Sequence, residues 1–437
     1  MFFLCLLLVS SCFLSNHLLA QKINIPELKI KFDDKGNNFL KFNISNQVWL
    51  RYIDLNPGSQ LDGYNIENSF DIGLRRTRFQ ATGQFDRVLL YVHIGQNNFS
   101  FNTARKQGIF IHDALGELAL MKDKFYIGAG LTGWGAFSRG SLSSTTQILT
   151  MDVPIQHYAT LDISDQFLRK LAVYAKGLVG KFNYRLAIAK PMTIKNSNAQ
   201  SEIISERSLF SNKPSHLQIQ GYLMYHFWEK ESNASAYLPS TYHGEKQIFN
   251  LGIGFLHQNN AMWHYNAALD TIEQDLNIIN VDAFLEYPLN SNKANAITVN
   301  AAYTYTNYGK DYIRNVGVMN PANGVNHLSS FNGIGNAYPM MGTGHNIMFQ
   351  LGYLFRKDLL KDWGTLQPYF ALQYGQFDAL KNAADTYHLG LNWLISNSKA
   401  KISLHYENRP IFTDNGNGEI FRNSRKGMLI TQLQIAL

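Results

Sequence analysis

The chain has 437 residues and a net charge of +7, and 13% of its residues are aromatic whereas only 16% are charged. Its mean hydropathy is −0.19, and no run of 18 apolar residues follows residue 20, which excludes a helical membrane protein. The basic residues are spread out, without any run of five or six Lys or Arg, so nucleic acid is not an expected partner.

Residues 1–20 are apolar and contain no acidic residue and no Lys or Arg, which predicts a secretory signal peptide. Two alternatives remain: a membrane anchor, which the polar residues 15–17 interrupt, and a lipoprotein signal at residues 9–12, which further apolar residues follow. Both cysteines lie in this segment, so the mature chain is expected to have no disulfide and no cysteine-bound metal. Residues 21–38 are predicted to form a short periplasmic arm, followed by a barrel at residues 39–437.

The stretch at residues 70–97 shows the pattern of that barrel. In its first half Thr77 and Phe79 share one face of an extended strand, whereas Arg76 and Arg78 share the other. The two arginines need water, and the opposite face needs lipid or a core. A barrel in a membrane supplies both, with lipid outside and water inside.

The same alternation recurs as sixteen segments, most of them about 10–14 residues long. Short turns alternate with longer polar segments between them. The predicted strands are 40–53, 70–83, 88–97, 113–121, 124–133, 168–179, 182–190, 215–227, 247–257, 276–287, 295–308, 345–356, 366–377, 386–395, 400–409 and 428–437. The predicted outer loops are 54–67, 98–112, 134–167, 191–213, 258–275, 309–344, 379–385 and 410–426.

This arrangement predicts an all-β fold: a transmembrane antiparallel β-barrel of about sixteen strands, with short periplasmic turns and long extracellular loops. Closure is required because lipid cannot satisfy an open sheet edge. A soluble β-sandwich also alternates, but its strands are usually nearer to about 5–6 residues. The outer membrane of a Gram-negative bacterium is the expected location. The apolar residues expected to point outward into lipid are Phe79, Leu90, Val92, Tyr184, Leu186, Leu251, Val299, Leu391 and Leu433.

Four segments carry a resemblance to a known family. Residues 74–79 read LRRTRF, and residues 168–191 read LRKLAVYAKGLVGKFNYRLAIAKP. With GIGF at 252–255 and YGKDYIRNVG at 308–317, they resemble the phosphate-selective porin O and P family of Gram-negative outer membranes. The resemblance covers most of residues 40–437. It implies a sixteen-stranded porin, often a trimer, that passes anions, and it places Arg76 and Arg78 in the basic early strand of the family. Members that select phosphate line the pore with a dense ladder of basic residues, whereas this lumen is mixed.

Charged residues on the predicted lumen face are more often basic than acidic. The excess predicts a mild preference for anions, because a positive wall lowers the entry energy of anions in a narrow wet pore. The alternative is that these charges pair across the lumen and hold neighbouring strands together. The basic positions are Lys41, Arg51, Arg76, Arg78, Lys176, Arg185, Lys401 and Arg409, and the acidic positions are Glu117, Asp282, Glu286 and Glu407.

Residues 134–167 form the third long outer loop, which in large porins often folds inward and narrows the channel. We expect this loop to fold into the lumen and to bring Arg139 to the pore, and the alternative is an external cap. A further segment, residues 228–246, is longer than the other turns on its side of the barrel.

The favoured function is passive diffusion of small polar solutes, with a mild preference for anions and phosphate among the candidates. No HExxH, G-x-S-x-G or GxxxxGK[ST] motif occurs, and His216 and His226 lie too far apart on one strand to share a metal, so no enzyme activity, cofactor or metal is expected. The alternatives are a barrel that binds or secretes a partner through its outer loops, residues 309–344 above all, and a barrel enzyme. The expected partners are outer-membrane lipid and small anions or polar solutes, and a homotrimer is one expected assembly.

Overall fold

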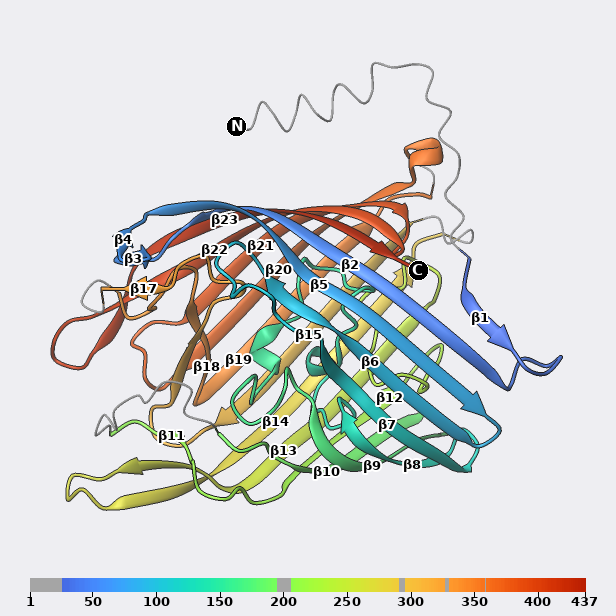
Figure 1. Cartoon of the computed structure of the whole chain (residues 1–437), viewed down its shortest axis with the longest axis horizontal. Coiled ribbons are helices and arrows are strands. Elements are labelled where there is room, and N and C mark those ends of the chain that lie inside the picture. The colour runs from blue at the N-terminus through green and yellow to red at the C-terminus, as the bar shows by residue number, and fades with distance from the viewer. Residues whose placement is uncertain (1–25, 195–205, 291–294, 327–329, 358) are drawn as a thin grey trace.

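The computed structural model describes residues 26–194, 206–290, 295–326, 330–357 and 359–437. Sixteen strands build its main sheet: β2 (Phe39–Asp54), β5 (Asn68–Phe85), β6 (Val88–Phe99), β7 (Phe110–Met121), β8 (Phe125–Thr132), β9 (Lys170–Val179), β10 (Phe182–Lys190), β12 (Gln218–His226), β13 (Ile248–Tyr265), β14 (Thr271–Pro288), β15 (Ala296–Asn307), β19 (Gly344–Leu354), β20 (Thr365–Phe377), β21 (Ala384–Ser396), β22 (Ala400–Asp414) and β23 (Ile420–Ala436). Each pairs antiparallel with the next along the chain, and β23 pairs with β2, so the sheet closes into a barrel (Figure 1). The predicted fold class and strand number are confirmed.

The predicted strand boundaries are wrong in two places. Residues 258–275 and 410–426 were expected to be loops, but β13 and β14 leave only residues 266–270 between them, and β22 and β23 leave only residues 415–419. Each hairpin contains a bulge, between Gln258 and Met262 in β13 and between Ile411 and Phe412 in β22. A bulge interrupts the period of two by which a strand is recognised in a sequence.

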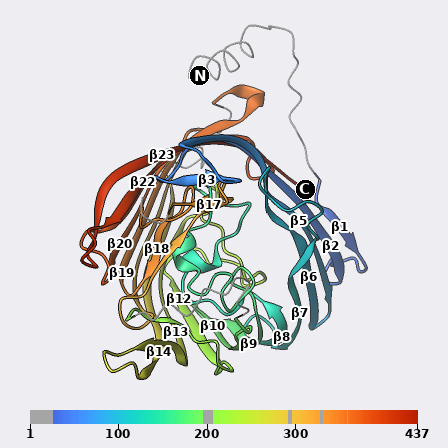
Figure 2. The same cartoon turned by 60° about the vertical axis from the view of Figure 1, so that its left-hand side comes forward.

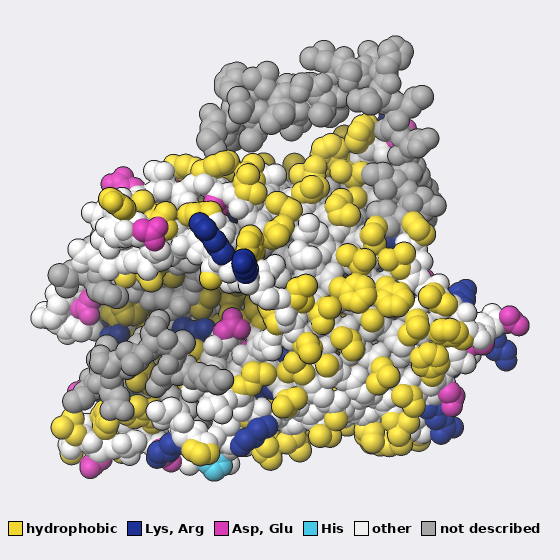
Figure 3. Space-filling view, in the orientation of Figure 1, with side chains coloured by type: hydrophobic (Ala, Val, Ile, Leu, Met, Phe, Trp, Pro, Cys, Tyr) yellow, Lys and Arg dark blue, Asp and Glu magenta, His cyan; other side chains and the backbone are white. Residues whose placement is uncertain are grey.

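The outer face of the barrel wall carries apolar side chains. In β13, Leu251 and Ile253 are exposed on the outer face. Asn250, the residue before Leu251, points to the opposite face and is buried on the lumen side. Figure 3 shows hydrophobic side chains over the wall and charged side chains mostly towards its two ends. The nine residues predicted to point outward are all exposed or half-buried: Phe79, Leu90, Val92, Tyr184, Leu186, Leu251, Val299, Leu391 and Leu433. This part of the prediction is confirmed.

Short elements decorate the barrel. β1 (Leu28–Lys31), in the segment predicted to be an arm, pairs with β2. β11 (Leu209–Phe210) pairs with β13, β16 (Ile313–Val316) with β18 (Tyr338–Gly342), and β3 (Ser59–Leu61) with both β4 (Tyr64–Asn65) and β17 (Gly324–Val325). Three 3-10 turns are η1 (Gly140–Leu142), η2 (Ile155–His157) and η3 (Lys361–Trp363).

Among the described residues, no helix has both the length and the apolar character needed to cross a membrane. The expected signal segment, residues 1–20, lies outside the described residues.

Candidate functional site

Three connecting segments fold into the lumen of the barrel (Figure 2). We call residues 133–169, between β8 and β9, the inner loop, and residues 308–343, between β15 and β19, the outer loop. Residues 227–247, between β12 and β13, come from the side of the short turns, and we call them the turn-side loop. Together they cover the inner faces of many strands.

Apolar residues of these loops pack into buried clusters inside the barrel. One cluster joins Ile148 and Val153 of the inner loop to Tyr338 and Met340 of the outer loop. Another joins Leu142 of the inner loop to Leu238 of the turn-side loop, and it continues onto β12 through Tyr222 and Met224. Backbone bonds reinforce the second contact, since Leu238 N–H donates to the Leu142 carbonyl at 2.6 Å. The loops therefore share small cores of their own and stabilise one another.

The inner loop reaches the strands opposite its origin. Gln47 of β2 donates to the Thr145 carbonyl at 2.8 Å. Lys401 of β22 donates to the Ile148 carbonyl at 3.1 Å, and Asn392 of β21 donates to the Leu149 carbonyl at 2.8 Å. The prediction that residues 134–167 fold inward is confirmed, and the alternative of an external cap is wrong.

A bulge in β5 brings three arginines to the lumen. The pairing of β5 with β2 passes from Leu74 to Arg76 while β2 advances by one residue, from Val48 to Gln47, so Arg75 has no partner in β2. A bulge of this kind re-aims a side chain, and Arg75, Arg76 and Arg78 are all buried on the inside of the wall. We call these three residues the arginine group.

One carboxylate of the inner loop meets the arginine group. Asp152 accepts from Arg75 Nη2 at 2.7 Å through one oxygen and from Arg76 Nη2 through the other. Burial alone would raise the pKa of Asp152, but the two guanidinium charges outweigh burial and lower its pKa to about 2. Asp152 is therefore ionised near neutral pH and ties the inner loop to β5.

Arg78 has a different environment. It donates to the Gln96 carbonyl at 3.2 Å, and it also contacts the amide oxygen of Asn97 and the ring of His112. No carboxylate lies within ion-pair distance of Arg78 among the described residues. The arginine group therefore carries three positive charges against the single negative charge of Asp152, an excess of two.

Trp49, an aromatic residue between Gln47 and Arg51 on the same face of β2, lies on the lumen side beside the arginine group. Its ring lies 5.2 Å from the Arg75 guanidinium, and its indole N–H donates to Gln432 at 2.7 Å. The side chain is almost fully buried. A tryptophan here gives an arginine a cation–π contact and keeps its own polar atom satisfied.

Several other predicted basic residues bind a carboxylate. Arg51 forms two bonds with Asp71, and it donates to the Val318 and Met319 carbonyls of the outer loop at 3.1 and 2.7 Å. Lys176 lies 2.9 Å from Glu117. Lys41 lies 2.6 Å from Glu27, close to the short turns, and is partly exposed. Arg51 and Lys176 therefore pair with a carboxylate on a nearby strand, whereas Lys41 pairs with a residue that precedes β1.

Arg139 and Arg185 contact the turn-side loop. Arg139 makes two bonds of 2.7 Å with Glu231. Burial would raise the pKa of Glu231, but Arg139 outweighs burial and lowers it. Arg185 donates to the Ala236 carbonyl at 2.7 Å and lies 4.7 Å from the Trp134 ring. Among the nine predicted basic residues, Arg76 and Arg78 lie together in the arginine group, and Lys176 and Arg185, which are opposite each other in β9 and β10, both contact the Trp134 ring.

Sequence reasoning missed Arg75 and the turn-side loop. Strict alternation puts Arg75 on the lipid face, where an arginine is costly. The Arg75–Arg76 doublet was the available signal, because two adjacent arginines in a membrane strand both reach water only if the strand bulges. The unusual length of residues 228–246 was the signal for the turn-side loop.

No protein-family model matches the chain, and no curated protein matches it. Among solved structures, OprB of Pseudomonas putida, determined at high pH, has a TM-score of 0.55 and 8% identity, and the match covers 91% of this chain and 94% of that one. OmpF of Salmonella typhi in complex with daunomycin has a TM-score of 0.51 and 10% identity, with 93% and 100% covered. Both neighbours are Gram-negative outer-membrane porins. At such identities the likeness shows the fold alone, and the resemblance to the phosphate-selective family is not confirmed.

Proposed function

We propose that this protein is a porin of the Gram-negative outer membrane that lets small polar solutes diffuse passively, with a mild preference for anions. A closed barrel with an apolar outer face and a polar inner face suits a lipid bilayer. Its fold is also that of the two porins described above. In the same proposal, residues 1–20 are a signal peptide, residues 21–38 a periplasmic arm, and residues 39–437 the barrel.

The path of the inner loop across the lumen is the observation that carries the proposal. The loop crosses the lumen and bonds to β2, β21 and β22 on the far side, so any solute has to pass beside it. Lumen-facing side chains such as Gln367, Asn392 and Gln434 are fully buried. Together these features support a narrow path for small solutes rather than a wide pore.

The arginine group supports the preference for anions. Its excess of two positive charges is buried behind other side chains, so it acts on a passing ion through its field rather than by contact. That field is screened over about 10 Å at ordinary ionic strength, which makes the preference mild. Phosphate is one candidate solute, and a homotrimer is the assembly that the family resemblance implies.

We assign the other predicted basic residues mainly to positioning. Arg51 fixes the outer loop, and Arg139, Lys176 and Arg185 fix the turn-side loop through carbonyl or carboxylate contacts. A barrel that binds a partner through residues 309–344 is less well supported, because most described residues of the outer loop are buried or half-buried inside the barrel.

Conductance in planar lipid bilayers tests the proposal. Wild type is expected to give small, stable conductance steps. A variant in which residues 143–150 are replaced by two glycines is expected to conduct several-fold more, because it removes the part of the inner loop that reaches β2, β21 and β22. Shortening the external turn at residues 415–419 is the matched control, and it is expected to leave the conductance unchanged. If neither wild type nor the shortened-loop variant passes ions or small sugars, the porin proposal is wrong.

A further inference from the structure

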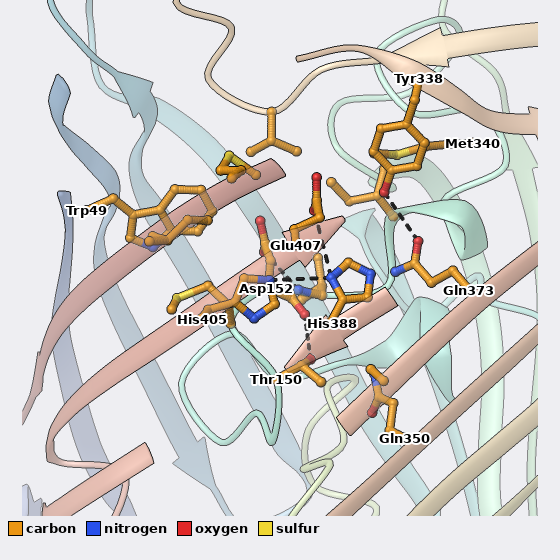
Figure 4. A pocket seen from close by; sticks show the side chains of 17 residues that line it. Trp49, Thr150, Asp152, Tyr338, Met340, Gln350, Gln373, His388, His405 and Glu407 are labelled. Carbon is orange, nitrogen blue, oxygen red and sulfur yellow. Dashed lines mark hydrogen bonds and ion pairs between the residues drawn. The ribbon is translucent and has the colours of Figure 1, made fainter. Parts of the chain in front are cut away.

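Two histidines and a glutamate gather on the lumen face of β21 and β22. His388 of β21 lies directly opposite Glu407 of β22 in the sheet. His405 precedes Glu407 by two residues, so both point to the same face of β22. All three side chains are buried and line a cavity of about 60 Å³ between the barrel wall and the inner loop (Figure 4).

The distances among these side chains suit a metal ion. His388 Nδ1 lies 3.3 Å from His405 Nε2 and 3.8 Å from Glu407 Oε2, and one ligand atom from each residue lies within 4.8 Å of the others. In a tetrahedral zinc site with metal–nitrogen bonds of about 2.0–2.1 Å, neighbouring ligand atoms lie about 3.3–3.4 Å apart. The two imidazole nitrogens already have this separation, and a small rotation brings the carboxylate to it.

A second layer orients His405. The Tyr369 hydroxyl lies 2.9 Å from His405 Nδ1, so Nε2 of the same ring points towards His388. Gly390 of β21 lies between Tyr369 of β20 and His405 of β22 in the sheet. The Tyr369 side chain can cross over Gly390 to His405 because glycine has no Cβ; a Cβ on Gly390 would stand 2.0 Å from the Tyr369 ring. A hydrogen bond that fixes the second nitrogen of a histidine ligand is typical of metal sites.

The atoms that face one another in the site have few other partners. Among the described residues, His388 Nδ1 has only His405 Nε2 and Glu407 Oε2 within hydrogen-bond or ion-pair distance. No lysine or arginine of the described chain lies within ion-pair distance of Glu407. A buried carboxylate without a cation is costly, and a divalent ion between the three side chains would remove that cost.

We propose that His388, His405 and Glu407 bind a divalent transition-metal ion such as Zn²⁺. Imidazole and carboxylate ligands suit zinc and its neighbours in the first transition series. Three protein ligands leave a fourth position, and the cavity of about 60 Å³ has room there for water, which needs about 10–15 Å³, or for a small polar solute. The site does not depend on the proposed transport function.

Zinc binding to the full chain, without a polyhistidine tag and after treatment with a chelator, tests the site. We expect one Zn²⁺ per chain by equilibrium dialysis, and at least about tenfold weaker binding in His388→Ala, His405→Ala and Glu407→Gln. Tyr369→Phe, which keeps all three ligands, is expected to weaken binding about tenfold through loss of orientation. His226→Ala is the matched control, since His226 is also buried on the lumen face but bonds to Asn250.

Three results of the zinc-binding measurements would overturn the proposal. Wild type that binds no Zn²⁺, or the same affinity in wild type and both histidine variants, means that the three side chains form no metal site. A loss in His226→Ala as large as in His388→Ala has the same meaning. Where a variant fails to fold, the visible absorption spectrum of wild type with added Co²⁺ replaces the comparison. Absorption bands of a four- or five-coordinate Co²⁺ site support the proposal, and their absence contradicts it.

Discussion

The Arg51–Asp71 pair and the arginine group lie close together on the lumen side of β2 and β5, and they differ in charge balance. Arg51 faces Asp71 directly across the two strands, and both side chains are fully buried. In the arginine group two guanidiniums, those of Arg75 and Arg76, bind Asp152, which belongs to a loop rather than to the wall, and Arg78 has no carboxylate partner among the described residues. One set is neutral and complete within the sheet. The other keeps an excess of two positive charges and depends on the inner loop for its carboxylate partner.

This difference separates a structural role from an electrostatic one. A neutral pair has little field beyond its own contacts, so Arg51 and Asp71 serve to join β2, β5 and the outer loop. An unbalanced group projects a field into the lumen and also makes the position of the inner loop depend on charge. The following predictions test that distinction.

The largest expected effect is the loss of Asp152. Asp152→Asn leaves two buried guanidiniums without their counter-charge, and breaking a buried ion pair in this way costs about 3–5 kcal/mol. The free energy of unfolding, measured by urea titration of the protein in lipid vesicles, is expected to fall by that amount. Glu419→Gln is the control, because the Lys381–Glu419 pair is exposed and such pairs contribute about 0–1 kcal/mol. Equal stability of Asp152→Asn and wild type would show that the inner loop does not need this contact.

The outer face of the barrel wall could be predicted from the sequence better than the lumen face, because the two faces have different surroundings. The outer face meets uniform lipid, so apolar residues recur with a strict period of two, and the sixteen strands and outward residues such as Leu251 and Leu433 could be recognised. The lumen face meets other parts of the chain, and its contacts depend on folding in three dimensions. Asp152 could not be matched to Arg76 because the two are 76 positions apart and join only when the inner loop folds inward.

The candidate metal site could not be predicted from the sequence for a related reason. His388 and His405 are 17 positions apart, a spacing with no meaning until the register of β21 and β22 is known. That register puts Glu407 opposite His388. Along a single strand, histidines such as His216 and His226 lie too far apart to share a metal, so no metal was expected.

The next effect in size is the pH dependence of stability. The pKa of Asp152 is about 2 in the folded protein, below its ordinary value of 3.8. A lowered folded pKa stabilises the protein above the unfolded pKa, and this stabilisation is lost as pH falls from about 4 to about 2. The shift corresponds to about 2 kcal/mol. Wild type is therefore expected to lose about 2 kcal/mol more than Asp152→Asn between pH 5 and pH 2, and parallel curves for the two proteins would contradict the assignment.

The smallest expected effect is the change in ion selectivity, and it separates the two sets of arginines most directly. Arg76→Gln/Arg78→Gln leaves Arg75 alone with Asp152, so the local excess of two positive charges disappears. Arg51→Gln/Asp71→Asn removes one charge of each sign and leaves the local net charge unchanged. Reversal potentials across a salt gradient should shift towards cations in the first variant only.

The size of that shift follows from screening. Because the arginines are buried and act across a salt solution, their effect on a passing ion should be about 0.4–1.4 kcal/mol, which is about a twofold to tenfold change in the permeability ratio. Conductance should change less, since the inner loop keeps its bond between Asp152 and Arg75. Wild type that already prefers cations, or equal reversal potentials in both double variants, would mean that the arginine group is structural like Arg51 and Asp71. The anion preference would then have to be abandoned, whereas the porin proposal, which depends on conductance, would stand.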